Sequence, residues 1–114
     1  MNTFGDVVRA RRRQLGHTVT RVAAKIGSHK GYVSGIENGK TPPPHWKILK
    51  RLATFLELDL LDLAELALAE KAPVWLRDRL RKRLMADNPL YNAQIVEPEP
   101  QKPDMVIPER KETA

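Results

Sequence analysis

Short helical segments that each end in glycine are the feature of this sequence that most constrains its fold. Between these glycines, apolar residues recur every three or four positions, which is the spacing of one helix face. Glycine readily takes the left-handed conformation that follows a helix, so Gly16, Gly27 and Gly39 are expected to end three helices. No stretch has the alternating pattern of a strand. We therefore expect an all-α fold.

Capping residues indicate where the first three helices begin. Thr3 followed by Asp6 resembles a capping box, so the first helix is expected over about residues 4–14. Thr18 is expected to cap the second helix. Only a few residues separate the end of that helix from the third, which is expected over about residues 29–38.

Prolines and acids organise the second half of the chain. Pro44 is suited to the first turn of a fourth helix, Asp59 and Asp62 open a fifth, and Pro73 begins a sixth. From about residue 89 the chain is polar and rich in proline, which predicts disorder. The expected organisation is an N-terminal helical domain over residues 1–65, a C-terminal helical extension over 66–88, and a disordered tail over 89–114.

Length and composition limit the class of protein. The 114 residues suffice for one domain with appendages, and the absence of cysteine excludes disulfides and thiolate metal sites. With no signal-peptide pattern and no apolar run long enough to span a bilayer, a cytoplasmic protein with no membrane partner is expected. Residues 1–51 carry eleven Lys or Arg against two acids, which favours a polyanion partner, although a solvated basic surface would give the same composition.

The third helix has two contrasting faces. Its expected core positions are His29, Tyr32, Val33 and Ile36. Its outward positions are Lys30, Gly31, Ser34, Gly35 and Asn38. Two interior glycines cost helix stability but thin the outward face, which suits close approach to another surface. The outward face is interpreted either as a helix lying in the DNA major groove or as an ordinary exposed face.

Four motifs in a fixed order carry a family resemblance. They are RARRRQLG (9–16), VAAKIG (22–27), YVSGIENGK (32–40) and LKRLATFLELDLLDL (49–63). Over residues 4–63 the chain resembles the Xre-type, lambda-repressor-like helix-turn-helix family. The resemblance implies a five-helix DNA-binding domain of a transcriptional regulator, expected to be a repressor that binds double-stranded DNA as a homodimer on a palindromic site.

The resemblance also assigns roles to individual residues. The third helix becomes the recognition helix, with base reading by Lys30, Gly31, Ser34 and Gly35. Phosphate contacts are implied for Thr18, Thr20, Arg21, Asn38, Lys40 and Thr41. Many members begin the second helix with a glutamine where this chain has Val19, which suggests less direct base reading and a modest preference for one sequence.

A structural ion pair between Arg12 and Glu37 is implied by the resemblance and supported by the sequence itself. Glu37 is the only acid between Asp6 and Glu57, and a partly buried carboxylate needs a cationic partner. One of the three consecutive arginines is therefore expected to face inward.

The sixth helix carries a leucine stripe that allows two interpretations. Leu76, Leu80 and Leu84 recur every four residues, with Trp75 beside them. This stripe is a candidate for dimerisation, and the alternative is an intramolecular cap over the fifth helix.

No residues suggest catalysis, a cofactor or a metal site. The three histidines have neither metal-ligand spacing nor a neighbouring acid and nucleophile. The alternative function is a helix-turn-helix fold used as a protein-interaction module, antitoxin-like or an assembly factor. Its partner would bind the C-terminal helix or the tail, whose one apolar cluster is MVIP (105–108).

Overall fold

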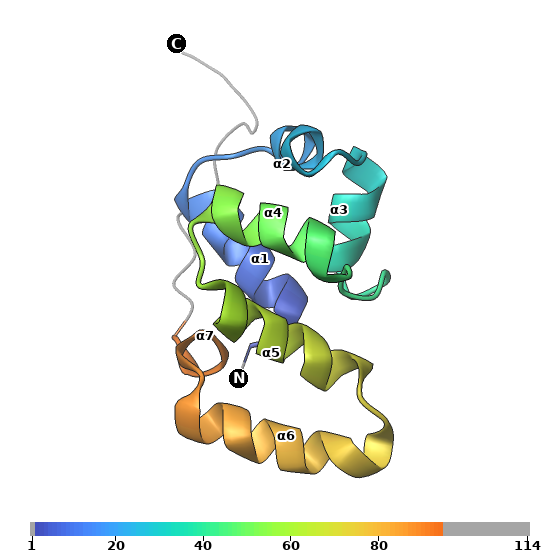
Figure 1. The fold of residues 1–114 in the computed structure, drawn as a ribbon. Helices are drawn as coiled ribbons and strands as arrows, with labels where there is room; N and C mark the ends of the chain where they lie inside the picture. Colours follow the sequence, from blue (N-terminus) through green and yellow to red (C-terminus); the bar gives the residue numbers. More distant parts are fainter. Residues whose placement is uncertain (1, 95–114) are drawn as a thin grey trace.

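The computed structural model describes residues 2–94, and all regular structure in that range is helical. The helices are α1 (Phe4–Gln14), α2 (Val19–Ile26), α3 (Lys30–Glu37), α4 (Trp46–Leu56), α5 (Leu60–Lys71), α6 (Val74–Asp87) and α7 (Pro89–Asn92). Figure 1 shows α2 and α3 at one end of the molecule and α6 at the other, with α1, α4 and α5 between them. The prediction of an all-α fold is confirmed.

The caps that the sequence indicates are present. The Thr3 hydroxyl accepts from the Asp6 N–H, and the Asp6 carboxylate accepts from the Thr3 N–H, which completes a capping box. The side chains of Thr18 and Asp59 accept backbone N–H groups in the same way at the starts of α2 and α5. Gly27 ends α2 in the left-handed conformation, with φ of 75°.

Two predicted helix starts are wrong by one or two residues. His29 was expected on the core face of the third helix, but it is exposed and precedes α3 as its N-cap, where its Nδ1 accepts from the Tyr32 N–H at 3.2 Å. Pro44 was expected in the first turn of the fourth helix, but α4 begins at Trp46. Pro44 is instead buried in the segment just before the helix.

One hydrophobic core joins α1 through α7. Its most buried large side chains include Phe4 from α1, Ile26 from α2, Leu56 from α4 and Leu63 from α5, each at most 1% exposed. Full burial of one such side chain contributes about 1.5 to 3 kcal/mol, so this shared core fixes how α2 and α3 are held. The predicted division at residue 65 falls inside the continuous helix α5.

Helix α6 packs on α5 with its leucine stripe turned inward. Leu84 is 5% exposed and Leu80 is half-buried against the core, while Trp75 is 80% exposed. The intramolecular cap therefore accounts for Leu84 and Leu80, and Leu84 is not available to a second chain. Trp75 remains on the outside.

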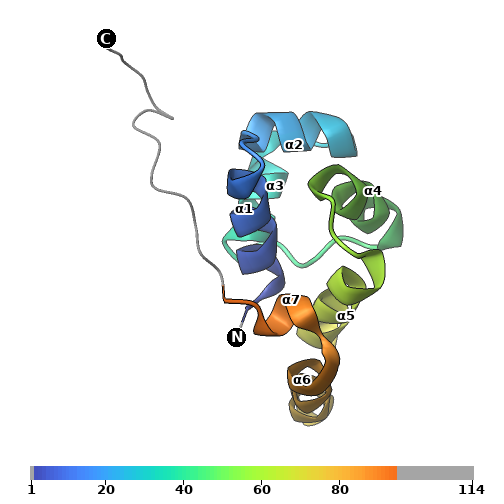
Figure 2. The same ribbon diagram turned by 90° about the vertical axis from the view of Figure 1, so that its left-hand side faces the viewer.

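The chain does not become disordered at residue 89, contrary to the prediction. Asn88 is fully buried, and its side-chain oxygen accepts from the N–H groups of Leu90 and Tyr91 to start α7. The Asn2 N–H donates to the Tyr91 carbonyl at 3.1 Å, which ties α7 to the beginning of α1 (Figure 2). The prediction of disorder rested on polar and proline-rich composition. It did not take into account that the Asn88 side chain can start a helix through hydrogen bonds to the backbone. Residues 95–114, including MVIP, lie outside the described residues.

None of the helices described is both long and apolar enough to cross a membrane.

Candidate nucleic-acid interface

The segment from α2 to α3 is two short helices joined by a tight turn. After Gly27, the Ser28 N–H donates back to the Ala23 carbonyl at 2.9 Å, and α3 starts two residues later. Val22 and Ile26 of α2 pack with Val33 of α3 in the core. The opposite side of α3 is thereby directed outward, at the right-hand edge of Figure 1.

The outward face of α3 is partly as predicted. Lys30, Gly31 and Asn38 are exposed, and Ser34 is half-buried. At Gly31, an added Cβ would meet only the His29 ring, at 3.4 Å, so the backbone is open to an incoming surface. Partial burial raises the pKa of the neighbouring Tyr32 hydroxyl above its ordinary value, because it disfavours the charged phenolate.

Gly35 differs from Gly31, because the chain itself covers it. An added Cβ at Gly35 would stand 3.1 Å from the Thr41 Cβ and would overlap the Thr41 hydroxyl oxygen. The expectation that Gly35 is a bare backbone patch is therefore wrong. Glycine is needed here so that the turn after α3 can pack against the helix.

That turn is held by backbone hydrogen bonds. The N–H groups of Lys40 and Thr41 both donate to the Gly35 carbonyl, at 2.9 and 3.1 Å, and Gly39 takes a φ of 74°. Asn38 closes α3 by donating its N–H to the Ser34 carbonyl at 3.0 Å. The turn thus presents the exposed side chains of Lys40 and Asn38 in a defined orientation.

The phosphate candidates of α2 lie at its first turn. The Thr18 hydroxyl already accepts from the Arg21 N–H at 3.1 Å, while the side chains of Thr20 and Arg21 are exposed. The Arg21 guanidinium lies 6.0 Å from the centre of the Phe55 ring, a cation–π distance that orients the long side chain.

Arg12 and Glu37 form a bidentate ion pair. Arg12 Nε and Nη2 donate to the two Glu37 carboxylate oxygens at 2.7 and 3.0 Å, and the side chains are 11% and 4% exposed. The same arginine donates to the His17 carbonyl at 3.1 Å. Arg9 adds a hydrogen bond to the Glu37 carbonyl at 3.2 Å. These bonds fix the end of α3 to α1.

The end of α3 also touches α1 directly. A Cβ added at Gly5 would lie 2.6 Å from the carbonyl oxygens of both Ile36 and Glu37. Only glycine permits this approach of two helix backbones, so α1 supports the C-terminal end of α3.

The family follows from a comparison with known proteins. A family model described as a helix-turn-helix domain matches residues 3–66, which is more than half of the chain. The chain belongs to the helix-turn-helix family. The resemblance drawn from the sequence is thereby confirmed, and α2 and α3 are the two helices of its motif.

A curated relative agrees with this family. The HTH-type transcriptional regulator SlrR of Bacillus subtilis (strain 168) is 33% identical over 70 residues, which make up 60% of this chain and 46% of SlrR. The match therefore spans less than half of the length of that relative. No solved structure matches the chain.

The surface of the helix-turn-helix motif is rich in cations. The exposed cations of α2, α3, the following turn and the start of α4 are Arg21, Lys25, Lys30, Lys40, Lys47 and Lys50. The only acid between Asp6 and Glu57 is Glu37, which is buried and neutralised by Arg12. No acid is thus exposed on the described surface of these four elements.

Two aromatic side chains near this surface were missed by the sequence analysis. Trp46 at the start of α4 is 61% exposed, and the Lys50 ammonium lies 5.6 Å from its ring centre. Phe55 stacks on His17 at a centroid distance of 4.4 Å. No feature of the sequence separated Trp46 from an aromatic residue of the core: Phe4 is also the first residue of its helix, yet it is 1% exposed.

Within residues 2–94 there is no cluster of three or more histidine, aspartate or glutamate side chains that could hold a metal ion.

Proposed function

We propose that the protein is a DNA-binding transcriptional regulator that inserts the outward face of α3 into the major groove. The observation that carries the proposal is the sign of the exposed charges on α2, α3, the turn and the start of α4: all are cations, and no acid is exposed among the described residues of these elements. A major groove about 12 Å wide admits one α-helix, and phosphates on both sides attract cations.

Base reading is assigned to the first two turns of α3. Lys30 and Ser34 supply one cation and one hydroxyl, and the open backbone at Gly31 lets the helix approach the base edges. Gly35 contributes in another way, since its contact with Thr41 orients the turn. With so few donors, we expect a modest preference for one sequence.

Phosphate contacts are assigned to both flanks of α3. On the α2 side, Thr20 and Arg21 are exposed, and on the other side the exposed groups are Asn38 and Lys40. Thr18 and Thr41 use their side chains within the protein, as an N-cap and in packing against Gly35, so they support the interface mainly by holding its shape.

Dimerisation on a palindromic site is the finer part of the proposal. We group as an apolar surface four large side chains that are each at least 59% exposed: Leu61 and Leu68 of α5 and Val74 and Trp75 of α6. Pairing of two copies through this apolar surface would provide two α3 helices for half-sites about 34 Å apart. A single domain that occupies its site blocks other proteins there, so we assign a repressor role.

The same apolar surface favours a second candidate function. A helix-turn-helix chain could use Val74 and Trp75 to bind a different protein, as an antitoxin-like or assembly module, and leave α3 unused. The name of its relative, a transcriptional regulator, supports the first candidate.

Selection from a random duplex library separates the two. If the protein is a regulator, the selected duplexes share one sequence motif. We expect its affinity for that motif to exceed its affinity for random duplex by less than about a thousandfold, which is the lower limit for specific DNA-binding proteins. An interaction module retains no duplex above background.

A further inference from the structure

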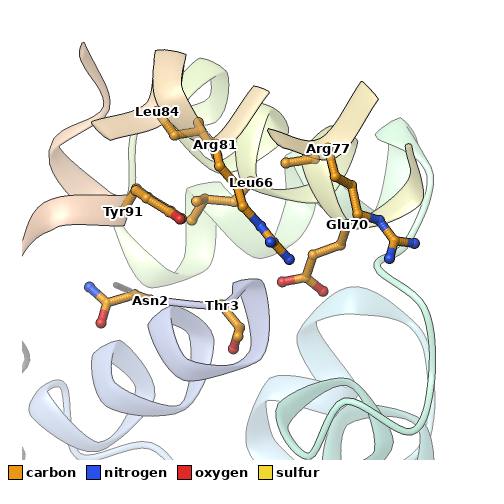
Figure 3. A pocket seen from close by; sticks show the side chains of 9 residues that line it. Asn2, Thr3, Leu66, Glu70, Arg77, Arg81, Leu84 and Tyr91 are labelled. Atoms are coloured by element: carbon orange, nitrogen blue, oxygen red, sulfur yellow. The ribbon is translucent and has the colours of Figure 1, made fainter. Parts of the chain in front are cut away.

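A pocket of about 450 Å³ lies between the start of α1 and the helices α5, α6 and α7. Figure 3 shows it from close by, with the side chains that line it. Its volume is within the range of about 300 to 1,000 Å³ that is typical of small-molecule sites. None of the residues assigned to DNA binding lines it.

The inner wall of the pocket is apolar and rigid. Leu66 of α5, Leu84 of α6 and Tyr91 of α7 line it, and each is at most 7% exposed. All three belong to the hydrophobic core, so their positions are fixed by packing. Such a wall suits the apolar body of a small ligand.

Three charged side chains line the pocket: Glu70 of α5, and Arg77 and Arg81 of α6. The Arg77 Nε donates to the Ala72 carbonyl at 2.9 Å, which ties Arg77 to the link between α5 and α6. In Figure 3 the Arg81 guanidinium extends from α6 toward Glu70 of α5 and Thr3. The one ion pair described for Arg81 is with Asp78, at 3.9 Å, and the two side chains are 57% and 87% exposed. Such a long and exposed ion pair contributes little free energy, so it does little to hold the Arg81 side chain in place. The guanidinium is therefore accessible to a ligand.

The Glu70 carboxylate is held at the start of α1 by a hydrogen bond from the backbone. Its Oε2 accepts from the Phe4 N–H at 2.6 Å, and the positive end of the α1 dipole favours a carboxylate there. No ion pair joins Glu70 to Arg81 in the part of the chain that is described. Arg81 and Glu70 thus face one pocket without forming an ion pair, and Arg77 is engaged with a backbone carbonyl.

We propose that this pocket binds a small zwitterion with an apolar body, of the α-amino acid class. The ligand carboxylate pairs with Arg81, its ammonium group pairs with Glu70, and its side chain packs on Leu66, Leu84 and Tyr91. A simple anion would face the Glu70 carboxylate, and a simple cation would face Arg81. A zwitterion satisfies both charged groups at once.

The pocket is also connected to the DNA-binding face, and this step rests on the proposed function. Thr3 in its wall is two residues from Gly5, whose backbone lies against the carbonyl groups of Ile36 and Glu37 at the end of α3. A ligand that ties α6 to α5 beside Thr3 therefore alters the support of α3. The bound zwitterion acts as an effector of DNA binding.

Calorimetric titration of the full chain tests the site without DNA. The probes are L-phenylalanine, phenylpropionate, which lacks the ammonium group, and phenylethylamine, which lacks the carboxylate. We expect saturable binding of L-phenylalanine, and a loss of about tenfold or more in affinity for either partial analogue, as for one charged hydrogen-bonded contact.

Matched variants assign the binding to the two charged groups. Arg81→Gln and Glu70→Gln should each weaken L-phenylalanine binding by about tenfold, while Lys82→Gln, an exposed neighbour that does not line the pocket, should leave it unchanged. Absence of saturable binding, or equal binding by all four proteins, overturns the proposal. All substitutions replace exposed or partly exposed polar groups, and melting curves verify folding.

The effector step is measured separately, as duplex affinity with and without saturating L-phenylalanine. A change of at least about threefold that is lost in Arg81→Gln supports it. An unchanged affinity overturns the effector role but leaves the site. A chain that binds L-phenylalanine but no duplex contradicts the proposed function and not the pocket.

Discussion

Thr41 packs against the α carbon of Gly35, across the turn that joins α3 to α4. The contact leaves no room for a side chain at residue 35, since an added Cβ would stand 3.1 Å from the Thr41 Cβ. The Gly35 carbonyl also accepts the N–H groups of Lys40 and Thr41. The glycine that was expected to thin the outward face of α3 instead makes room for the turn that presents Lys40.

Gly35→Ala should therefore displace that turn. Overpacking costs typically about 1 to 3 kcal/mol, which exceeds the roughly 1 kcal/mol that alanine gains in helix propensity. We expect a lower free energy of unfolding in urea and duplex binding weakened by about tenfold, or about 1.4 kcal/mol. Replacing Thr41 by glycine in the same chain should restore the free energy of unfolding but not the full duplex affinity.

Gly31→Ala is the matched change at the open position. Because nothing overlaps a Cβ there, the free protein should become more stable by about 0.5 to 1 kcal/mol, while duplex binding weakens as the methyl group meets the bases. Thermal melting and gel shifts measure both. A variant that is more stable and binds DNA as well as the parent would show that α3 does not approach DNA at residue 31.

Glu37→Ala should destabilise the fold severely. It leaves the Arg12 guanidinium, 11% exposed, without its carboxylate, and the loss of one partner of a buried pair costs about 3 to 5 kcal/mol. Denaturant unfolding measures the change.

Glu57→Ala is the control for that experiment. Glu57 lies 3.9 Å from Arg11 but is 70% exposed, so its loss should cost no more than about 1 kcal/mol. Equal effects of the two substitutions would mean that the Arg12–Glu37 pair does not hold α1 to α3.

Asn88→Ala should detach α7. The buried Asn88 side chain donates to the Asp62 carbonyl and to Glu65 Oε1, both at 2.9 Å, and accepts two N–H groups of α7. Leaving such groups unpaired costs about 1 to 3 kcal/mol. Faster hydrogen exchange at the amides of Tyr91 and Asn2, relative to the exposed control Asp87→Ala, is the expected result. Unchanged hydrogen exchange at these amides would show that Asn88 does not hold α7 against the rest of the protein.

Trp75→Ser should weaken self-association. Trp75 is 80% exposed, and burial of an aromatic side chain between two copies would make it a main contributor to binding. Sedimentation velocity of the full chain over a concentration series measures the association. Trp46→Ser, at the other exposed tryptophan, is the control. A dimer that survives Trp75→Ser unchanged, or a monomeric parent, contradicts the assignment of the dimer to α6.

The order of the first five helices could be predicted because local chemistry encodes it. Thr3 with Asp6, Thr18, Gly27 and Asp59 each act through residues that are near in sequence, and their caps form as expected. The Arg12–Glu37 pair was implied by the family resemblance. The sequence itself indicated only that Glu37, the one carboxylate in a long basic stretch, would pair with one of three consecutive arginines.

The features that sequence could not supply depend on contacts between distant segments. The contact of Thr41 with Gly35 depends on the path of a turn, and the burial of Tyr91 depends on Asn2, which is 89 positions away. The pocket lined by Glu70 and Arg81 needs α5, α6 and α7 to be positioned against α1. Helical periodicity reports which face is apolar, but not which helix covers it.

The salt dependence of duplex affinity tests the central assignment of the DNA-binding surface most directly. If four to eight phosphates are contacted, the slope of log affinity against log salt should be about −4 to −7, at about −0.9 for each phosphate. The double variant Lys30→Ala/Lys40→Ala should have a shallower slope, and Lys71→Ala/Lys82→Ala, at the other end of the molecule, should not. A slope near zero, or a slope that changes only with Lys71 and Lys82, would contradict the assignment of DNA binding to α3 and its turn.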